Sequence, residues 1–160
     1  MLANSVSDDT IIYFKEHPRT SSMPADYDAQ RAAWFYKEVL SKHPNVIFIN
    51  DKFSPFDLID NAYCVAMATG STAIESVVRG KYCIIFGDNW FSNLPGVLRC
   101  YCKSDVRNAL NTIETTTIKK SDIYKYLAKL EEYSDDISYL FKSNVSFRRD
   151  IERQITEKVT

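Results

Sequence analysis

Short apolar runs alternate with amphipathic segments along most of this chain, and no other feature constrains its fold as strongly. Runs rich in β-branched and aromatic residues predict five strands, at residues 11–15, 46–49, 63–68, 82–86 and 97–102. Because these runs are apolar on both faces and helical patterns separate most of them, they are typical of a parallel sheet covered on two sides. We therefore expect one α/β domain over residues 1–160, with a five-stranded parallel sheet flanked by helices in a core at about 11–115 and a helical C-terminal tail at 116–160.

Apolar residues at helical spacing predict the helices that flank this sheet. They fall at residues 28–42, 55–60 and 72–79, around 106–113 and 123–130, and in a last segment marked by Phe147, Ile151 and Ile155. Ser54 before Pro55 fits an N-cap followed by proline at the first helical position, and Gly80 fits a C-terminal helix stop. Strands and helices then alternate, as a parallel sheet requires.

The composition excludes several classes of protein. A net charge of −1 over 160 residues argues against a nucleic-acid platform, since binding the nucleic-acid backbone needs a basic excess on one face. The N-terminal residues lack the pattern of a secretory signal, and the longest apolar runs are far shorter than the roughly 20 residues of a membrane span. The four cysteines show no CxxC spacing and no matching pair of histidines, so we expect free thiols, no metal and no cofactor in a cytoplasmic protein.

The turn between the third predicted strand and its helix has the pattern of a phosphate site. The apolar run stops at Thr69, and Gly70, Ser71 and Thr72 follow before the helical pattern is established. Small side chains let a ligand approach the backbone closely, and the free N–H groups at the start of a helix point at an anion. Ligands of parallel sheets bind beyond the carboxyl ends of the strands, where this turn is expected to lie.

Glu75 has two interpretations from spacing alone. Thr72-Ala73-Ile74-Glu75 matches a capping box, in which the Thr72 hydroxyl and the Glu75 carboxylate satisfy free N–H groups at the helix start. The same carboxylate is suited to bind the hydroxyl groups of a ribose. Both interpretations stay open at the level of the sequence.

A second candidate group ends the first predicted strand. Lys15, His17 and Arg19 would project to one side of an extended segment and offer three donors to a phosphate. The same alternation also fits a solvated strand end. In the loop after the fourth strand, Trp90 and Phe91 could stack on a base or sugar, or fold back onto the core. These groups frame an anionic ligand if the strand ends converge.

Five short motifs occur in order along the chain. They are Tyr13-Phe14-Lys15-Glu16-His17-Pro18-Arg19, Ser54-Pro55-Phe56-Asp57-Leu58-Ile59, Thr69-Gly70-Ser71-Thr72-Ala73-Ile74-Glu75, Gly80-Lys81-Tyr82-Cys83-Ile84-Ile85-Phe86-Gly87 and Pro95-Gly96-Val97. Together they resemble bacterial capsule polysaccharide biosynthesis proteins over about residues 11–115. The resemblance implies a Rossmann-like fold and the C-terminal, nucleotide-sugar-binding half of a two-domain GT-B glycosyltransferase, similar to the Kdo transferases of capsule assembly.

The resemblance also implies roles for particular residues. It makes His17 a ligand of the donor phosphate and the candidate catalytic group, with Lys15 and Arg19 as further nucleotide-binding residues. The remaining nucleotide-binding residues are Ser54, Gly70, Ser71, Thr72 and Glu75, of which Gly70, Ser71 and Thr72 would bind the phosphate and Glu75 the ribose. The expected ligand is a nucleotide-activated sugar, such as CMP-Kdo.

A full transferase of this kind needs a second domain for the acceptor, and 160 residues hold only one. We therefore expect a missing N-terminal acceptor domain or partner chain, incomplete catalysis by this chain alone, and any peripheral membrane contact to come through such a larger assembly. A non-catalytic sugar-nucleotide-binding module and a fragment of a sugar-nucleotide epimerase are alternative interpretations. A phosphoacceptor receiver fits less well, because the third strand ends in Thr69-Gly70 rather than in an aspartate.

Overall fold

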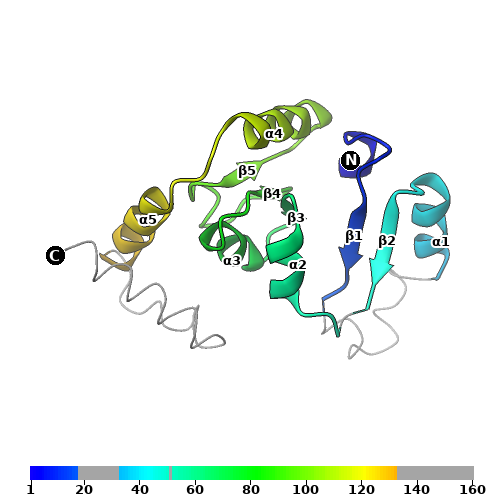
Figure 1. Cartoon of the computed structure of the whole chain (residues 1–160), viewed down its shortest axis with the longest axis horizontal. Coiled ribbons are helices and arrows are strands. Elements are labelled where there is room, and N and C mark those ends of the chain that lie inside the picture. Colours follow the sequence, from blue (N-terminus) through cyan, green and yellow to red (C-terminus); the bar gives the residue numbers. More distant parts are fainter. Residues whose placement is uncertain (18–32, 51, 133–160) are drawn as a thin grey trace.

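The computed structural model describes residues 1–17, 33–50 and 52–132, and the structural statements below refer to these ranges (Figure 1). The elements are η1 (Leu2–Asn4), β1 (Ile12–Lys15), α1 (Ala33–Lys42), β2 (Val46–Ile49), α2 (Pro55–Asn61), β3 (Val65–Met67), α3 (Thr72–Val78), β4 (Cys83–Ile85), β5 (Val97–Arg99), α4 (Lys103–Thr115) and α5 (Lys120–Glu132). The α/β class is confirmed, and each strand lies within its predicted run. The start of the helix predicted at 28–42 and the predicted helix around Phe147, Ile151 and Ile155 lie outside the described residues.

The described strands form two parallel sheets, and they do not show the single five-stranded sheet that was predicted. β1 pairs with β2, and β3, β4 and β5 form a second sheet in that order. In the view of Figure 1, β1 lies between β2 and the three-stranded sheet. An apolar run predicts that a segment is a buried strand, but it does not determine which strand edges pair.

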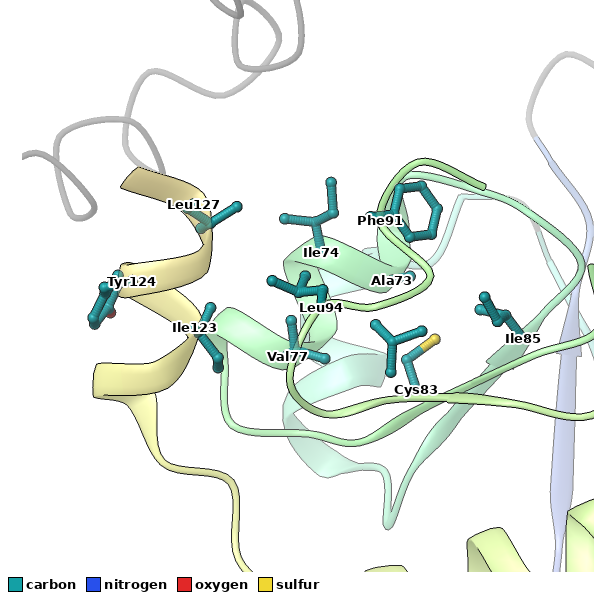
Figure 2. Packing of buried hydrophobic residues seen from close by; sticks show 11 residues of the cluster. Ala73, Ile74, Val77, Cys83, Ile85, Phe91, Leu94, Ile123, Tyr124 and Leu127 are labelled. Carbon is teal, nitrogen blue, oxygen red and sulfur yellow. The ribbon is translucent and has the colours of Figure 1, made fainter. Parts of the chain in front are cut away.

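β4 lies at the centre of the three-stranded sheet and is buried on both faces. Cys83 and Ile85 pack on α3, α5 and the loop after β4, in a cluster that includes Ala73, Ile74, Val77, Phe91, Leu94, Ile123, Tyr124 and Leu127 (Figure 2). Ile84 packs in a second cluster with Cys100, Val106, Ala109 and Ile113, most of which come from α4. Each large apolar side chain fully buried in this way contributes about 1.5–3 kcal/mol. The three-stranded sheet is therefore a well-packed base for the loops at its ends.

The two-stranded sheet is covered less completely. The Phe48 ring contacts the Phe14 ring, with centroids 4.8 Å apart, and the Tyr36 ring, with centroids 4.9 Å apart. α1 therefore packs on the face of the sheet that carries Phe48, and Phe14 on the same face stays partly exposed. Tyr13 and Ile47 lie opposite each other on adjacent strands and are exposed. Tyr13 and Ile47 alternate with the covered residues, as expected for a pleated sheet.

Local signals in the sequence set several helix ends. Ser54 caps α2, because its hydroxyl accepts a hydrogen bond from the backbone N–H of Asp57 at 3.3 Å, and Pro55 is the first residue of the helix. Gly80 follows the end of α3 with a φ of 81°, a conformation that glycine adopts without strain. Both predictions are confirmed. None of the described helices is long and apolar enough to cross a membrane.

Candidate functional site

The turn after β3 and the loop after β4 contact each other at the carboxyl edge of the three-stranded sheet. The side-chain amide of Asn89 donates a hydrogen bond to the backbone carbonyl of Thr69 at 2.8 Å. Gly87 lies so close to the same residue that a Cβ atom on it would be 2.8 Å from Thr69 Cγ2. The loop after β4 therefore holds the turn on one side.

The same loop contacts the end of β5. The hydroxyl of Tyr101 donates a hydrogen bond to Asp88 Oδ1 at 2.6 Å, and the guanidinium of Arg99 pairs with that oxygen at 3.6 Å. The hydrogen bond to Asp88 is the largest of the effects that raise the pKa of Tyr101. Because Asp88 and Asn89 are neighbours in sequence, one loop joins the ends of all three strands.

The turn presents backbone donors that have no acceptor in the described part of the chain. The N–H groups of Gly70, Ser71 and Thr72 bond to no described protein group, while the carbonyls of Gly70 and Ser71 accept hydrogen bonds from the next residues of α3. Ser71 is the N-cap of α3, but its side chain makes no capping hydrogen bond. Three successive N–H groups at the edge of a parallel sheet are suited to an anion.

Gly70 is not required by the fold. Its φ is not positive, and a Cβ atom on it would be 3.4 Å from Met67 Sδ, which is close to an ordinary contact. The backbone conformation and the packing would thus both accept alanine. What glycine adds at this position is space beside the turn.

Glu75 does not form the capping box that its spacing allows. The N-cap is Ser71 rather than Thr72, and the Glu75 carboxylate accepts no hydrogen bond from a described residue. The neighbouring cation is held elsewhere, since Arg79 donates to both carboxylate oxygens of Asp60, with 2.6 Å between Nε and Oδ1. Burial raises the pKa of Glu75, and the charge of Arg79 opposes this shift. Glu75 is therefore a half-buried carboxylate with unused acceptors in the first turn of α3.

The basic candidates lie in the other sheet. Lys15 is the last residue of β1 and His17 follows it as an exposed residue, while Arg19 lies outside the described residues. Between them, Glu16 accepts a hydrogen bond from the Tyr36 hydroxyl at 3.1 Å. Lys15 and His17 thus end the two-stranded sheet, whereas the turn after β3 belongs to the three-stranded one. The structure assigns the two predicted halves of the site to different sheets.

A comparison with protein families shows which family the chain belongs to. The family model of capsule polysaccharide biosynthesis proteins matches residues 1–130, which include both sheets, the turn after β3 and the loop after β4. The chain belongs to this family. Neither the curated proteins nor the solved structures give a significant match. The family supports a role in capsule polysaccharide synthesis and leaves the chemistry of this chain to be argued from its residues.

In this capsule polysaccharide biosynthesis protein, one of the two residues Trp90 and Phe91 packs on the core and the other is free to stack on a base or sugar. Phe91 is 1% exposed and belongs to the core, whereas Trp90 is 44% exposed in the loop that holds the turn. The two rings meet edge to face with centroids 5.2 Å apart. Core packing is therefore confirmed for Phe91, and Trp90 keeps a free surface at the carboxyl edge.

Sequence reasoning missed several polar residues at this edge of the family member, namely Asp88, Asn89, Arg99 and Tyr101. Their signal was their position, since they lie at or just after the ends of the fourth and fifth strands, where ligands of parallel sheets bind. The expected strand to residue 102 hid part of this signal, because β5 ends at Arg99 and Cys102 caps α4. Ser54 has its capping role, and its nucleotide-binding role stays a prediction.

The described parts of this capsule biosynthesis protein contain no group of three or more His, Cys, Asp or Glu residues that could hold a metal ion. Cys64, Cys83, Cys100 and Cys102 are free thiols. Burial raises the pKa of Cys83 to about 12, so this thiol stays protonated at neutral pH. Cys83 therefore has the character of a packing residue rather than of a nucleophile.

Proposed function

We propose that this chain is the donor-binding half of a GT-B glycosyltransferase of capsule synthesis, and that it binds a nucleotide-activated sugar at the carboxyl edge of the three-stranded sheet. The observation that carries the proposal is the turn from Gly70 to Thr72, whose N–H groups bond to no described acceptor. Membership of the capsule polysaccharide biosynthesis family supports it. The donor is a CMP-sugar such as CMP-Kdo.

Each part of the donor has a candidate partner at this edge. The phosphate accepts hydrogen bonds from the turn, and the hydroxyls of Ser71 and Thr72 add to them. Glu75 receives the ribose hydroxyls on a carboxylate that no described residue uses. The exposed ring of Trp90 offers a face for the base. Ser54, next to α2, remains a further candidate for the nucleotide.

Lys15, His17 and Arg19 join this site if β1 lies beside β3. Among the described strands β1 pairs only with β2, and β3 pairs only with β4. If β1 pairs with β3 when the donor binds, the strand order becomes β2-β1-β3-β4-β5, which is a known order of doubly wound sheets with a binding site at the carboxyl edge between β1 and β3. This arrangement is the single Rossmann-like domain expected from the sequence.

His17 then has a catalytic role. Its imidazole neutralises charge that develops on the leaving phosphate, which is electrostatic stabilisation of the transition state. A charge-assisted hydrogen bond of this kind contributes about 1.5–3 kcal/mol. The acceptor and the base that deprotonates it belong to an N-terminal domain or partner chain, so this chain alone is incomplete for catalysis. Any peripheral membrane contact comes through that larger cytoplasmic assembly.

A thermal-shift panel with CMP, CDP, UDP and GDP tests the proposal, with cytidine as the control that lacks a phosphate. A ligand that binds only the folded state stabilises it by about 2.7 kcal/mol at 100 times its dissociation constant. The proposal expects CMP to raise the melting temperature by several degrees and cytidine to raise it much less. A preference for UDP would favour the epimerase alternative or a different transferase. A panel without any response would contradict nucleotide binding.

A further inference from the structure

Arg99 is a cation at the same carboxyl edge as the turn after β3. It is the last residue of β5, where it lies opposite Ile85 of β4, and its side chain is 45% exposed. Its guanidinium pairs with Asp88, so the side chain extends toward the loop after β4.

The Arg99 guanidinium contacts Asp88 and also interacts with the Tyr101 side chain, where it opposes the rise in pKa that the hydrogen bond to Asp88 causes. At 3.6 Å the contact with Asp88 is longer than a charge-assisted hydrogen bond, which measures about 2.7–2.9 Å. The same carboxylate oxygen already accepts the hydroxyl of Tyr101 at 2.6 Å. Since a guanidinium carries five N–H donors, Arg99 has donors that an oxyanion can use.

The neighbouring contacts fix the position of Arg99 relative to the turn. Asn89, the residue after Asp88, donates to the carbonyl of Thr69, so the same loop contacts the ends of β3 and β5. Adjacent strands lie about 4.8 Å apart, which puts the ends of β3 and β5 roughly 10 Å from each other across β4. A ligand on the turn that extends across the end of β4 therefore reaches Arg99.

We propose that Arg99 binds an anionic group of the ligand held by the turn, and that this group competes with Asp88 for the guanidinium. This inference rests on the proposed function, because it needs a ligand at the turn. The group that Arg99 binds is an oxyanion that accepts two parallel N–H donors. A phosphate of the nucleotide and a carboxylate of the sugar both have this chemistry.

Calorimetric titration of the whole chain with cytidine, CMP, CDP and a CMP-linked sugar acid tests this proposal. Arg99→Ala should weaken binding of the ligand that carries the contacted group by about 10- to 150-fold, the loss expected for a hydrogen bond to a charged group. The affinity of Arg99→Lys should lie between that of wild type and that of Arg99→Ala, since an ammonium keeps the charge but cannot donate two parallel hydrogen bonds. Arg107→Ala is the matched control, because Arg107 is also exposed and its loss changes the net charge equally. It should change affinity less than about twofold.

Asp88→Asn separates a binding role from a structural one. The amide oxygen of asparagine still accepts the Tyr101 hydroxyl, but the charge that competes with the ligand for Arg99 is gone. If Arg99 binds the anion, Asp88→Asn should strengthen binding severalfold while Arg99→Ala weakens it. If the pair only supports the loop, both substitutions should weaken binding, and that result would overturn the proposal.

The ligand series identifies the anionic group. If Arg99→Ala weakens the binding of CMP, Arg99 contacts the first phosphate. If it weakens only the binding of CDP, Arg99 contacts the second phosphate, and if it weakens only that of the CMP-linked sugar acid, Arg99 contacts the carboxylate. Each of these results supports the proposal. If wild type binds and Arg99→Ala matches Arg107→Ala for every ligand, this inference fails and the proposed function stands. If wild type binds none of the phosphorylated ligands, the proposed function and this inference fail together.

Discussion

Asn89 donates its side-chain amide to the backbone carbonyl of Thr69 across 2.8 Å and so ties the loop after β4 to the turn before α3. Asn89 is itself held in place. Its backbone N–H donates to the Ser92 hydroxyl at 2.7 Å, and its side-chain oxygen accepts the backbone N–H of Trp90 at 2.7 Å. The turn and the loop therefore respond together to a change in either one.

Asn89→Asp should weaken CMP binding by about tenfold, because a carboxylate cannot donate to the Thr69 carbonyl and repels an anion on the turn. It should also lower the free energy of unfolding by about 1–2 kcal/mol. Calorimetric titration and urea unfolding measure the two effects. Asn93→Asp is the control, since Asn93 is exposed in the same loop and the change of charge is the same. Equal losses of affinity in both variants would show that charge alone acts.

Gly87→Ala should destabilise the fold by about 1–3 kcal/mol, since the new Cβ would lie 2.8 Å from Thr69 Cγ2. Thr69→Ser removes that methyl group and should recover most of the loss in the double variant. A double-mutant cycle by urea unfolding measures the coupling. Additive effects would contradict the close contact between the loop and the turn.

Gly70→Ala should behave differently from Gly87→Ala. The fold has room for a methyl group at this position, and alanine restricts the unfolded chain, so stability should be unchanged or higher by up to about 1 kcal/mol. Affinity for CMP should nevertheless fall, because the methyl group occupies space beside the N–H groups of the turn. Thermal unfolding and CMP titration measure both. Wild-type affinity in this variant would place the ligand away from Gly70.

The sequence predicted the elements of this fold better than their assembly. Apolar runs located all five strands, and the Ser54-Pro55 pair and Gly80 located helix ends, because these signals act within a few residues. The pairing of β1 was not predictable in this way, since any of the predicted strands offers the same backbone groups along its edge.

In the candidate site, too, local features were predictable and contacts between separate segments were not. Gly70, Ser71 and Thr72 were found because a local motif marks them, and the structure leaves their N–H groups without a described acceptor. Asn89 and Arg99 were missed because their role depends on contacts between separate loops. The spacing of Thr72 and Glu75 allows a capping box, but α3 starts at Thr72, so Ser71 is the N-cap and the box does not form.

Glu75→Gln should stabilise the protein at neutral pH. Burial raises the pKa of Glu75 above its ordinary value of 4.5, so the folded state holds the proton more tightly than the unfolded state does. The ionised carboxylate therefore lowers stability at high pH, and this cost disappears as the pH falls below about 4.5. Urea unfolding at pH 7 and pH 4 should show a difference between variant and wild type only at pH 7. The same difference at both values would contradict an effect of ionisation.

The same variant tests the ribose role of Glu75. A ribose contact that uses two acceptor oxygens should weaken when one becomes an amide nitrogen, so the affinity for CMP should fall severalfold. 2′-Deoxy-CMP lacks one of the hydroxyls, so the substitution should reduce its affinity much less. Titration of wild type and Glu75→Gln with both nucleotides measures the difference. An equal loss for both would exclude the 2′-hydroxyl as the group that Glu75 binds.

The central claim is that the turn from Gly70 to Thr72 receives the phosphate of a nucleotide. Titration of the ¹⁵N-labelled protein with CMP, followed by amide NMR, tests it most directly, because the amide groups proposed as ligands are the ones observed. If the turn binds the phosphate, the largest shifts should fall on the amides of Gly70, Ser71 and Thr72, with smaller ones at Asn89. Shifts confined to other elements at saturating CMP, with these four amides unchanged, would contradict it.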